Sequence, residues 1–387
     1  MKKIMISIDS FHDGGAEMFA IRLANGLSDN YEVHFMEYRA GASNVKAQKA
    51  QLNSKVKIFS PEESIYYRII SKFNRITRGQ YSRIISSTLS YCRYICIQKY
   101  IEKNKISTVN SHAIECNNVL TRIKKHNPTL KLVLSLHGHY ELYRNNYDVT
   151  KFRTLITNHI VGFDNIIYTT LDQLNTFIEF GLDTSRAKRI FYGLVFETSK
   201  ASHKPFKAGD ILNLILVSRA IPEKGWKEAI LAVISLNENN VKVNLELVGD
   251  GPLLSELKSK NYPDFIRFAG NVDNVLPLIE DAHIGLLPTY YYAESLPNSV
   301  IEYLSCGKPV VASNIGAIED MLSYNNEIAG VLISNQRGNP VKVDELKTSI
   351  EKFATNPQLY NLYSTLAFGA SEKFNMSACL SDYSSLL

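Results

Sequence analysis

Short runs of β-branched and other apolar residues alternate with amphipathic segments along the whole chain. Apolar runs of this length, bounded by polar turns, are typical of buried strands. Strands that alternate with helices form parallel sheets with right-handed crossovers. The pattern predicts strands at residues 3–8, 32–38, 56–59, 106–111, 131–136, 165–170, 189–193, 212–218, 243–249, 265–270, 283–288, 309–313 and 330–333.

These strands form two sets, separated by the polar stretch ETSKASHKPFKAGD at residues 197–210. A chain of 387 residues suits two domains better than one. We therefore predict an α/β protein with Rossmann-like domains at residues 1–196 and 211–367, joined by a linker at 197–210. Because such folds bind ligands at the carboxyl ends of their strands, the two sheets are expected to face a central cleft.

Composition narrows the class of protein without naming a function. The hydrophobic fraction of 45% and the charged fraction of 21% are typical of a globular protein. A net charge of +5 gives no reason to expect nucleic-acid binding. The sequence has no run of 18 apolar residues, which argues against a transmembrane helix. The opening MKKIMISIDSF is interrupted by Asp9 and resembles a buried strand more than a signal peptide.

The cysteines indicate a reducing compartment. Their number is odd and their spacing matches neither a disulfide framework nor a zinc site, so we predict a cytoplasmic protein. The five are Cys92, Cys96, Cys116, Cys306 and Cys379.

Residues 65–105 differ from the rest of the chain in charge. They contain nine basic residues and one acidic residue, Glu102, while the rest of the chain has a net charge of −3. Tyrosine and isoleucine are interleaved with the basic residues, as in IYYRIISKF. A basic, aromatic amphipathic helix suits an anionic membrane surface. An ordinary surface helix with its apolar face on the sheet explains the pattern equally well.

The segment ESLPNSVIEY, residues 294–303, combines two glutamates with a helix start. Pro297 is expected as the first helical residue, and the helix should end near Ser305, before Gly307. The free N–H groups at its start would form an anion site. On a straight helix, Glu294 and Glu302 would lie about 12 Å apart. That exceeds the roughly 5 Å of a retaining glycosidase pair and favours nucleotide-sugar binding over carboxylate-pair hydrolysis.

A second segment, VSRAIPEKGWKEAI at residues 217–230, follows the first strand of the second set. Arg219 and Lys224 lie in its loop, where two cations could neutralise a leaving diphosphate. A solvated loop is the alternative. The chain has no D-x-D motif for a metal–diphosphate clamp, so a cationic substitute would be needed. Gly249 and Gly251 lack the third glycine of a dinucleotide fingerprint, and there is no P-loop.

The order SRAIPEKGW, LELVGDGP, IRFAGNV, ESLPNSVIEYLSCGKPVVAS and GAIED resembles the carboxyl-terminal half of glycosyltransferase family 4. These are retaining group 1 enzymes of the GT-B fold that use nucleotide-diphospho-sugars. The resemblance is collinear over residues 212 to about 323. The first half is similar more loosely, in GGAEMFAIRLANGL at 14–27 and LSLHGHY at 134–140.

The resemblance implies roles for individual residues. Arg219 and Lys224 would contact the donor diphosphate, Glu294 the sugar hydroxyls and Glu302 the ribose. His137 would lie beside the reacting centre, bonding donor-sugar or acceptor hydroxyls. The remaining donor-side residues would be Gly14, Gly15, Gly270, Asn271, Ser295, Leu296, Asn298 and Glu319.

Other positions depart from the family pattern or are ambiguous. Tyr192-Gly193 stands where the family usually has Asn-Gly, which leaves the edge of the site open to question. His112 is a candidate for acceptor binding. His139 is interpreted as a structural histidine, and Glu319 could equally face solvent. Residues 368–387 would form a terminal helix that crosses back to the first domain, as in the family.

The resulting prediction is a retaining glycosyltransferase of type EC 2.4 that needs no metal and no cofactor beyond a UDP- or GDP-type donor. Family habit suggests a glycan or lipid-linked acceptor in bacterial surface polysaccharide synthesis, such as O-antigen, capsule, exopolysaccharide or lipopolysaccharide. Such an enzyme would be cytoplasmic, with peripheral attachment to the inner face of the membrane through residues 65–105. The alternatives are a nucleotide-sugar epimerase of the same fold and an inactive partner protein that binds sugar nucleotides.

Overall fold

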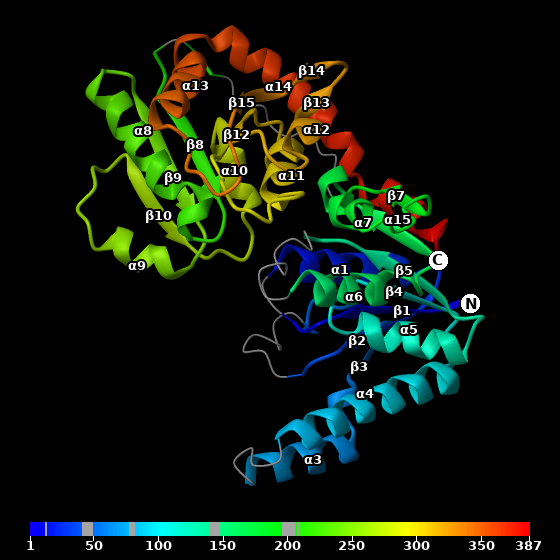
Figure 1. The fold of residues 1–387 in the computed structure, drawn as a ribbon. Coiled ribbons are helices and arrows are strands. Elements are labelled where there is room, and N and C mark those ends of the chain that lie inside the picture. The colour runs from blue at the N-terminus through cyan, green and yellow to red at the C-terminus, as the bar shows by residue number, and fades with distance from the viewer. Residues whose placement is uncertain (12–13, 41–48, 77–81, 139–147, 196–205, 208) are drawn as a thin grey trace. The chain divides into compact units, whose positions relative to one another are not determined.

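The computed structural model describes the chain except residues 12–13, 41–48, 77–81, 139–147, 196–205 and 208. The chain divides into two compact units (Figure 1). Unit 1 comprises Met1–Gly193 and Met376–Leu387, and unit 2 comprises Leu194–Asn375. Most of the predicted linker, and His139, lie outside the described residues.

Unit 1 is built on a parallel sheet whose described strands run in the order β3-β2-β1-β4-β5-β6-β7. The sheet core is apolar, with Val109, Leu132 and Leu134 buried against α4, α5 and α6. The elements of unit 1 are β1 (Lys3–Ile8), α1 (Gly15–Leu27), β2 (Glu32–Glu37), β3 (Lys57–Phe59), η1 (Pro61–Glu63), α3 (Ile65–Ile76), α4 (Ser82–Asn104), β4 (Thr108–Ser111), α5 (Asn117–His126), β5 (Lys131–Ser135), α6 (Val149–Ile160), β6 (Asn165–Tyr168), η3 (Leu171–Leu174), α7 (Asn175–Glu179), β7 (Ala187–Arg189) and α15 (Met376–Ser384).

Helix α15 completes unit 1, although it lies at the far end of the sequence. It packs against α1, where a Cβ on Gly26 would come within 2.7 Å of Leu380. On its inner face Tyr383 is fully buried, and its hydroxyl lies 3.3 Å from Ser135 Oγ on β5. The carboxyl-terminal helix is therefore part of unit 1, where it packs on α1 and reaches β5.

Unit 2 contains a second parallel sheet, with described strands in the order β10-β9-β8-β11-β12-β15. Its core includes the single tryptophan, Trp226, which is the first residue of α8 and is fully buried. The elements are β8 (Leu212–Val217), η4 (Pro222–Lys224), α8 (Trp226–Glu238), β9 (Val243–Val248), α9 (Pro252–Lys258), β10 (Ile266–Gly270), α10 (Leu276–Asp281), β11 (Ile284–Leu287), α11 (Asn298–Ser305), β12 (Val310–Ser313), α12 (Ile318–Leu322), β13 (Ser323–Tyr324), β14 (Glu327–Ile328), β15 (Gly330–Ile333), α13 (Val343–Thr355), α14 (Pro357–Ser371) and η5 (Glu372–Phe374).

The strand predictions are confirmed within a residue or two at all but one position, so the α/β class with two parallel sheets is confirmed. The exception is the strand predicted at 189–193, because β7 covers Ala187–Arg189. Ile190 and Tyr192 imitate a strand pattern because both are buried, at 2% and 4% exposure, although β7 ends at Arg189. The β13–β14 hairpin was not predicted, although Asn325 and Asn326, both with positive φ, are typical of such a turn.

Helix α11 also differs from its prediction. It begins at Asn298, and Pro297 is its N-cap residue in an extended conformation rather than the first helical residue. It ends at Ser305, and Gly307 adopts the left-handed conformation expected after a helix (φ 63°). Because Glu294 precedes the helix, the straight-helix geometry assumed for Glu294 and Glu302 is wrong.

Candidate active site

Loops from two strands of unit 2 meet at a buried ion pair. Lys224 follows β8 and Glu294 follows β11, and Lys224 Nζ lies 2.5 Å from Glu294 Oε2. Both residues are nearly inaccessible, at 8% and 6% exposure. The ammonium and the carboxylate are therefore held side by side at the carboxyl edge of the sheet, where parallel α/β folds bind ligands.

A buried pair of this kind depends on both partners. Its Coulomb attraction offsets the desolvation of two charges, so removing one partner leaves an uncompensated buried charge. Tyr291 adds to the environment, because Lys224 Nζ lies 5.1 Å from its ring centroid and Arg219 Cζ lies 5.4 Å from it. One aromatic ring thus contacts both predicted diphosphate cations. Tyr291 was not predicted as a site residue, although it belongs to the aromatic run TYYYAES.

Arg219 is exposed, unlike Lys224, and its loop is held by the turn after β9. Ala220 N–H donates to Asp250 O at 2.9 Å, and Leu253 N–H donates to Ala220 O at 2.9 Å. A Cβ on Gly251, whose φ is 155°, would come within 2.6 Å of Ala220 O. The glycines of VGDGP therefore allow close approach to the Arg219 loop.

The loop carrying Lys224 is packed just as closely against the end of β11, the strand that neighbours β8 in the sheet. Gly225 is left-handed (φ 74°), and a Cβ there would lie 2.3 Å from Pro288 O at the end of β11. Tyr290 N–H donates to Glu223 O at 2.8 Å. These contacts hold the ends of β8 and β11 together, so the position of Lys224 relative to Glu294 is determined by backbone packing as well as by charge.

Arg337, from the loop after β15, fixes the backbone on either side of the glutamate. Its Nη1 donates to Tyr292 O at 2.5 Å and to Glu294 O at 2.8 Å. Gly338 N–H donates to Tyr290 O at 2.8 Å. Arg337 was not predicted, because nothing in its local sequence, NQRGNP, indicates a contact with a loop more than forty residues earlier.

Helix α11 is anchored by Tyr303, whose hydroxyl accepts from Val217 N–H at 2.7 Å and donates to Leu286 O at 3.3 Å. Because the helix begins at Asn298, its N-terminus comes directly after the loop that carries Glu294. Four predicted donor residues occupy this stretch: Ser295 and Leu296 are buried before the helix, Asn298 is its first residue, and Glu302 is half-buried on its second turn.

The other predicted donor residues of unit 2 lie on neighbouring turns. Gly270 ends β10 with φ 73°, and its carbonyl accepts from Gly249 N–H at 2.7 Å. Asn271 is exposed beside it. Glu319 is exposed in the first turn of α12, where its carboxylate accepts from Asn314 Nδ2 at 3.0 Å. The donor-binding roles of Gly270, Asn271 and Glu319 stay predictions.

In unit 1, the two candidate histidines are hydrogen-bonded to each other. His112 follows β4 and His137 follows β5, and His112 Nδ1 lies 2.7 Å from His137 Nε2. The other nitrogen of His112 lies 2.7 Å from Asn110 Oδ1, and His137 Nδ1 is bonded to the Tyr192 hydroxyl. We refer to Asn110, His112, His137 and Tyr192 as the histidine network.

The donors and acceptors of this network can be assigned from one end. Asn110 Nδ2 donates to Val133 O at 3.2 Å, so its Oδ1 must be the acceptor for His112 Nε2–H. Neutral His112 then accepts at Nδ1 from His137 Nε2–H. His137 Nδ1 accepts in turn from the Tyr192 hydroxyl. Both histidines are thus assigned as the Nε2–H tautomer.

Burial keeps the network neutral. Desolvation lowers the pKa of His137 to about 3, and it holds the pKa of His112 well below its usual range. Burial also raises the pKa of the Tyr192 phenol. The ring of Tyr192 stacks on Phe19 with centroids 4.3 Å apart. Since both ring nitrogens of His137 have partners inside unit 1, a new ring hydrogen bond to substrate requires one of these partners to exchange.

The predicted glycines of unit 1 lie at the start of α1. Gly14 is its N-cap in an extended conformation, and Gly15 is its exposed first residue. A Cβ on Gly14 would meet only the flexible carboxylate of Glu17. Neither the bond from Tyr192 to His137 nor the bond between Asn110 and His112 was predicted; the departure from Asn-Gly at 192–193 was the signal for the former.

The five cysteines are free thiols. Among the described residues, no group of three or more His, Cys, Asp and Glu side chains could hold a metal ion. Within that same part of the chain, no helix has the length and apolar character needed to cross a membrane.

Residues 212–355 match the family model described as "Glycosyl transferases group 1". An uncharacterized glycosyltransferase of Methanocaldococcus jannaschii is 22% identical over 98% of this chain and 96% of its own. A Campylobacter jejuni protein named GalNAc-alpha-(1->4)-GalNAc-alpha-(1->3)-diNAcBac-PP-undecaprenol alpha-1,4-N-acetyl-D-galactosaminyltransferase is 23% identical over 79% of this chain and 77% of its own.

The structure of Anabaena HepE in complex with UDP superposes with a TM-score of 0.73 at 17% identity, covering 100% of this chain and 99% of HepE. Sucrose-phosphate synthase from Thermosynechococcus elongatus gives a TM-score of 0.71 at 15% identity, covering 100% and 98%. At these identities the superpositions establish the fold. The matches together confirm the predicted resemblance to group 1 glycosyltransferases and the GT-B fold.

Proposed function

We propose that this protein is a retaining, metal-independent glycosyltransferase of the family 4 type, which transfers a sugar from a nucleotide-diphospho-sugar to a hydroxyl of a lipid-linked glycan. The observation that carries the proposal is the Lys224–Glu294 pair, with Arg219 sharing the Tyr291 ring. A cation for the diphosphate and a carboxylate for sugar hydroxyls are adjacent, as one nucleotide-sugar would require.

In the proposed reaction, the bond between the anomeric carbon and the β-phosphate oxygen breaks as the acceptor oxygen bonds to the same face of the sugar. The acceptor proton passes to an oxygen of the departing diphosphate. Arg219, Lys224 and the N–H groups at the start of α11 stabilise the charge that develops on the leaving group. Well-aimed groups of this kind each contribute about 3 to 4 kcal/mol to catalysis.

The proposed acceptor class rests on the relatives. The Campylobacter jejuni relative is named for transfer to an undecaprenol-diphosphate-linked glycan. We extend this to a place in bacterial surface polysaccharide synthesis, with the protein at the inner face of the cytoplasmic membrane. The basic segment at residues 65–105 supports that location.

A melting panel with UDP, GDP, ADP and CMP tests the donor site. A ligand at a hundred times its dissociation constant stabilises the folded state by about 2.7 kcal/mol. We expect one nucleoside diphosphate to raise the melting temperature of the wild type and to have little effect on Glu302→Ala. Trp226 provides a second signal, because its indole N–H donates to Ser218 Oγ at 2.8 Å, next to Arg219.

Once the nucleotide is known, a turnover assay with the matching nucleotide-sugar, with and without an acceptor, identifies the reaction. A transferase consumes the matching nucleotide-sugar only when an acceptor is supplied, whereas an epimerase converts the donor alone. Binding without either reaction would favour an inactive partner protein. No shift with any of the four nucleotides would contradict the assignment of Lys224, Glu294 and Glu302.

A further inference from the structure

Helix α3 exposes a row of large apolar side chains. Ile65, Tyr66, Ile69, Phe73 and Ile76 are between 52% and 71% exposed. At 3.6 residues per turn they fall within an arc of about 100° on the helix. A contiguous apolar surface of this kind is uncommon unless it meets a partner.

The charges beside this row are all positive. Arg68 and Lys72 are exposed, and the helical wheel places them next to Ile65 and Ile76. The sequence contains no Asp or Glu between Glu63 and Glu102. The outer face of α3 therefore combines apolar and cationic side chains without a compensating acid, which is the composition of a helix that lies in an anionic lipid interface.

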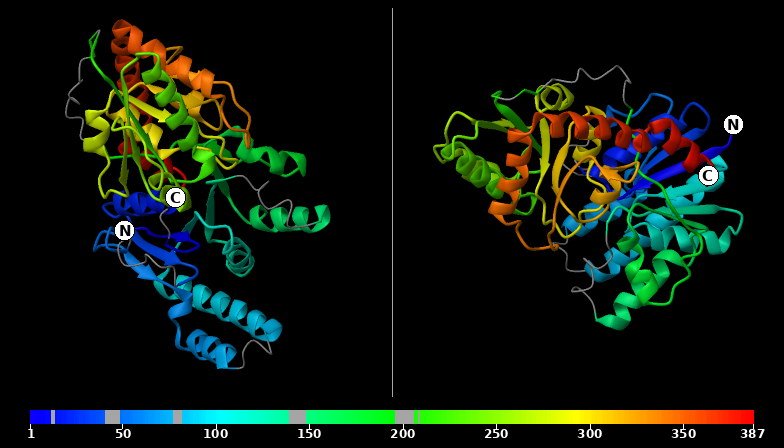
Figure 2. Two further views of the ribbon diagram at one scale, coloured as in Figure 1. Left: turned by 90° about the vertical axis from the view of Figure 1, so that its left-hand side faces the viewer. Right: turned by 90° about the horizontal axis from the view of Figure 1, so that it is seen from above.

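The neighbouring helix α4 belongs to the same basic segment but differs from α3 in burial. Tyr94, Ile97 and Ile101 of α4 are buried in the core of unit 1. The ordinary explanation for residues 65–105, an apolar face on the sheet, is therefore correct for the carboxyl-terminal part of α4, whereas Ile84 and Tyr91 nearer its start are exposed. Helix α3 packs on α4 and η1 at the edge of unit 1 instead (Figures 1 and 2).

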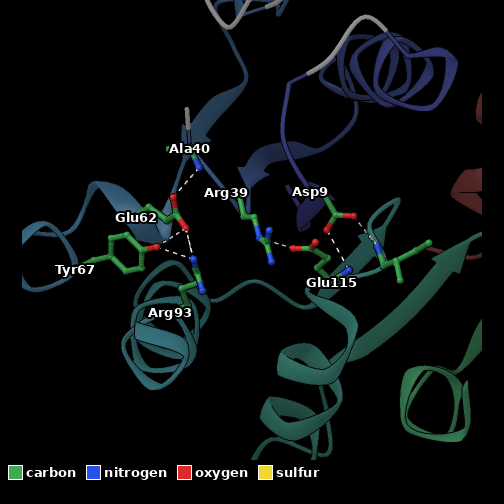
Figure 3. A network of polar contacts seen from close by, with 8 residues as sticks. Asp9, Arg39, Ala40, Glu62, Tyr67, Arg93 and Glu115 are labelled. Atoms are coloured by element: carbon green, nitrogen blue, oxygen red, sulfur yellow. Dashed lines mark hydrogen bonds and ion pairs between the residues drawn. The ribbon is translucent and has the colours of Figure 1, made fainter. Parts of the chain in front are cut away.

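The inner side of α3 is held by a carboxylate (Figure 3). Glu62 accepts from Tyr67 of α3 at 2.7 Å, from Arg93 Nε of α4 at 2.9 Å and from Ala40 N–H after β2 at 3.0 Å. These three bonds come from three different elements. They connect the helix directly to the chain that leaves the carboxyl end of β2.

The same edge of the sheet continues from this carboxylate to the next strands (Figure 3). Arg39, also after β2, is paired with Glu115. Asp9, after β1, accepts from Ile114 N–H at 3.0 Å and from Glu115 N–H at 3.1 Å, both after β4. Since His112 follows the same strand, α3 is connected through polar contacts to the edge that holds the histidine network.

We propose that the outer face of α3 docks on an anionic lipid bilayer and holds the carboxyl edge of the unit 1 sheet at a set height above the lipid headgroups. The biological use of this docking, access to a lipid-linked acceptor, rests on the proposed function; the docking itself does not. The Glu62 contacts transmit the orientation of the helix to that edge.

Vesicle flotation of the full chain tests the proposal. We expect the wild type to float with vesicles of mixed phosphatidylcholine and phosphatidylglycerol, weakly with phosphatidylcholine alone, and less at high salt. Ile69→Ser/Phe73→Ser should lower the partition coefficient about tenfold or more because it removes inserted apolar surface. Arg68→Glu/Lys72→Glu should have an effect of about the same size on anionic vesicles only.

Matched controls come from unit 2. Leu231→Ser/Leu362→Ser changes side chains that are 54% and 51% exposed, and Lys242→Glu/Lys258→Glu changes two exposed lysines. Both should float like the wild type. Failure of the wild type to bind either vesicle, or equal binding by the α3 variants, would overturn the proposal. So would conversion of a dimer to a monomer by Ile69→Ser/Phe73→Ser with vesicle binding unchanged, because a second copy would then cover the face.

The nucleotide panel separates this proposal from the proposed function. The α3 variants should keep the nucleotide-dependent melting shift of the wild type. If the protein floats with vesicles but binds no nucleotide, the docking proposal stands and the transferase proposal falls. If it binds a nucleotide but does not float, the transferase proposal stands and the docking proposal falls.

Discussion

The candidate catalytic residues of unit 2 are charged, whereas the candidate histidines of unit 1 belong to a neutral network. Lys224 and Glu294 are a buried ion pair, and Arg219 lies beside them on an exposed loop. His112 and His137 are desolvated and share a hydrogen bond with no charge between them. Under the proposed function, unit 2 would neutralise the charge on the leaving group, and unit 1 would position neutral groups with assigned donors and acceptors.

The ion pair is expected to give the largest effect, on stability and turnover together. Lys224→Met leaves the Glu294 carboxylate buried without a partner, so we expect unit 2 to lose about 3 to 5 kcal/mol of unfolding free energy. Turnover should fall about a hundredfold or more. Since Trp226 is the only tryptophan, its fluorescence during denaturation reports unit 2 alone.

The double variant Lys224→Met/Glu294→Leu separates the two effects. With both charges removed, most of the lost stability should return, because replacing a buried pair by apolar residues is often neutral. Turnover should stay low. A double variant as unstable as the single one, or one with turnover near that of the wild type, would contradict the roles given to this pair.

Arg219 sharpens the comparison within unit 2, because it is exposed and contributes little to folding. We expect Arg219→Ala to cut turnover about a hundredfold while the unfolding free energy changes by less than about 0.5 kcal/mol. Lys242→Ala, another exposed cation of unit 2, is the matched control and should change neither quantity. A loss in turnover below about threefold would remove Arg219 from the leaving-group assignment.

In unit 1, Tyr192→Phe removes the hydroxyl that donates to His137 and keeps the ring that stacks on Phe19. Leaving the buried His137 Nδ1 without this donor should cost about 1 to 3 kcal/mol. Hydrogen exchange of β4 and β5 measures the loss, and ¹⁵N shifts of His137 show whether the Nε2–H tautomer persists. Tyr94→Phe, another buried tyrosine of unit 1, is the control. Unchanged exchange and an unchanged tautomer would exclude Tyr192 as a positioning residue.

The last expected effect is a dependence of stability on pH, which appears only on the acid side. The pKa of His137 is about 3 in the folded state, below its ordinary value of 6.5, so the unfolded state binds more protons between these values. This contribution to stability is complete above pH 6.5 and is lost as the pH falls toward 3. His137→Gln should therefore reduce the acid-side slope of stability by up to about 1.4 kcal/mol per pH unit. An unchanged slope would mean that the histidine is not desolvated.

Much of the fold could be predicted from local pattern. Strand positions were correct because a fully buried parallel strand is a short apolar run bounded by turns. The failure at 189–193 shows the limit of that signal, since Tyr192 is buried by packing on Phe19 rather than by strand pairing. The site residues of unit 2 came from motifs whose spacing reflects adjacent βα loops, but Tyr291 and Arg337 contact them across loops that no motif connects.

The sequence by itself determined the two α/β sheets, the group 1 glycosyltransferase resemblance and the candidate cations and glutamates, because each depends on residues close together along the chain. Tertiary structure alone decided that Lys224 pairs with Glu294, seventy residues away, and that Tyr192 completes the bonding of His137. It also decided which half of the basic segment is buried. Such contacts depend on how loops from separate strands meet in space, and the local sequence pattern does not determine how they meet.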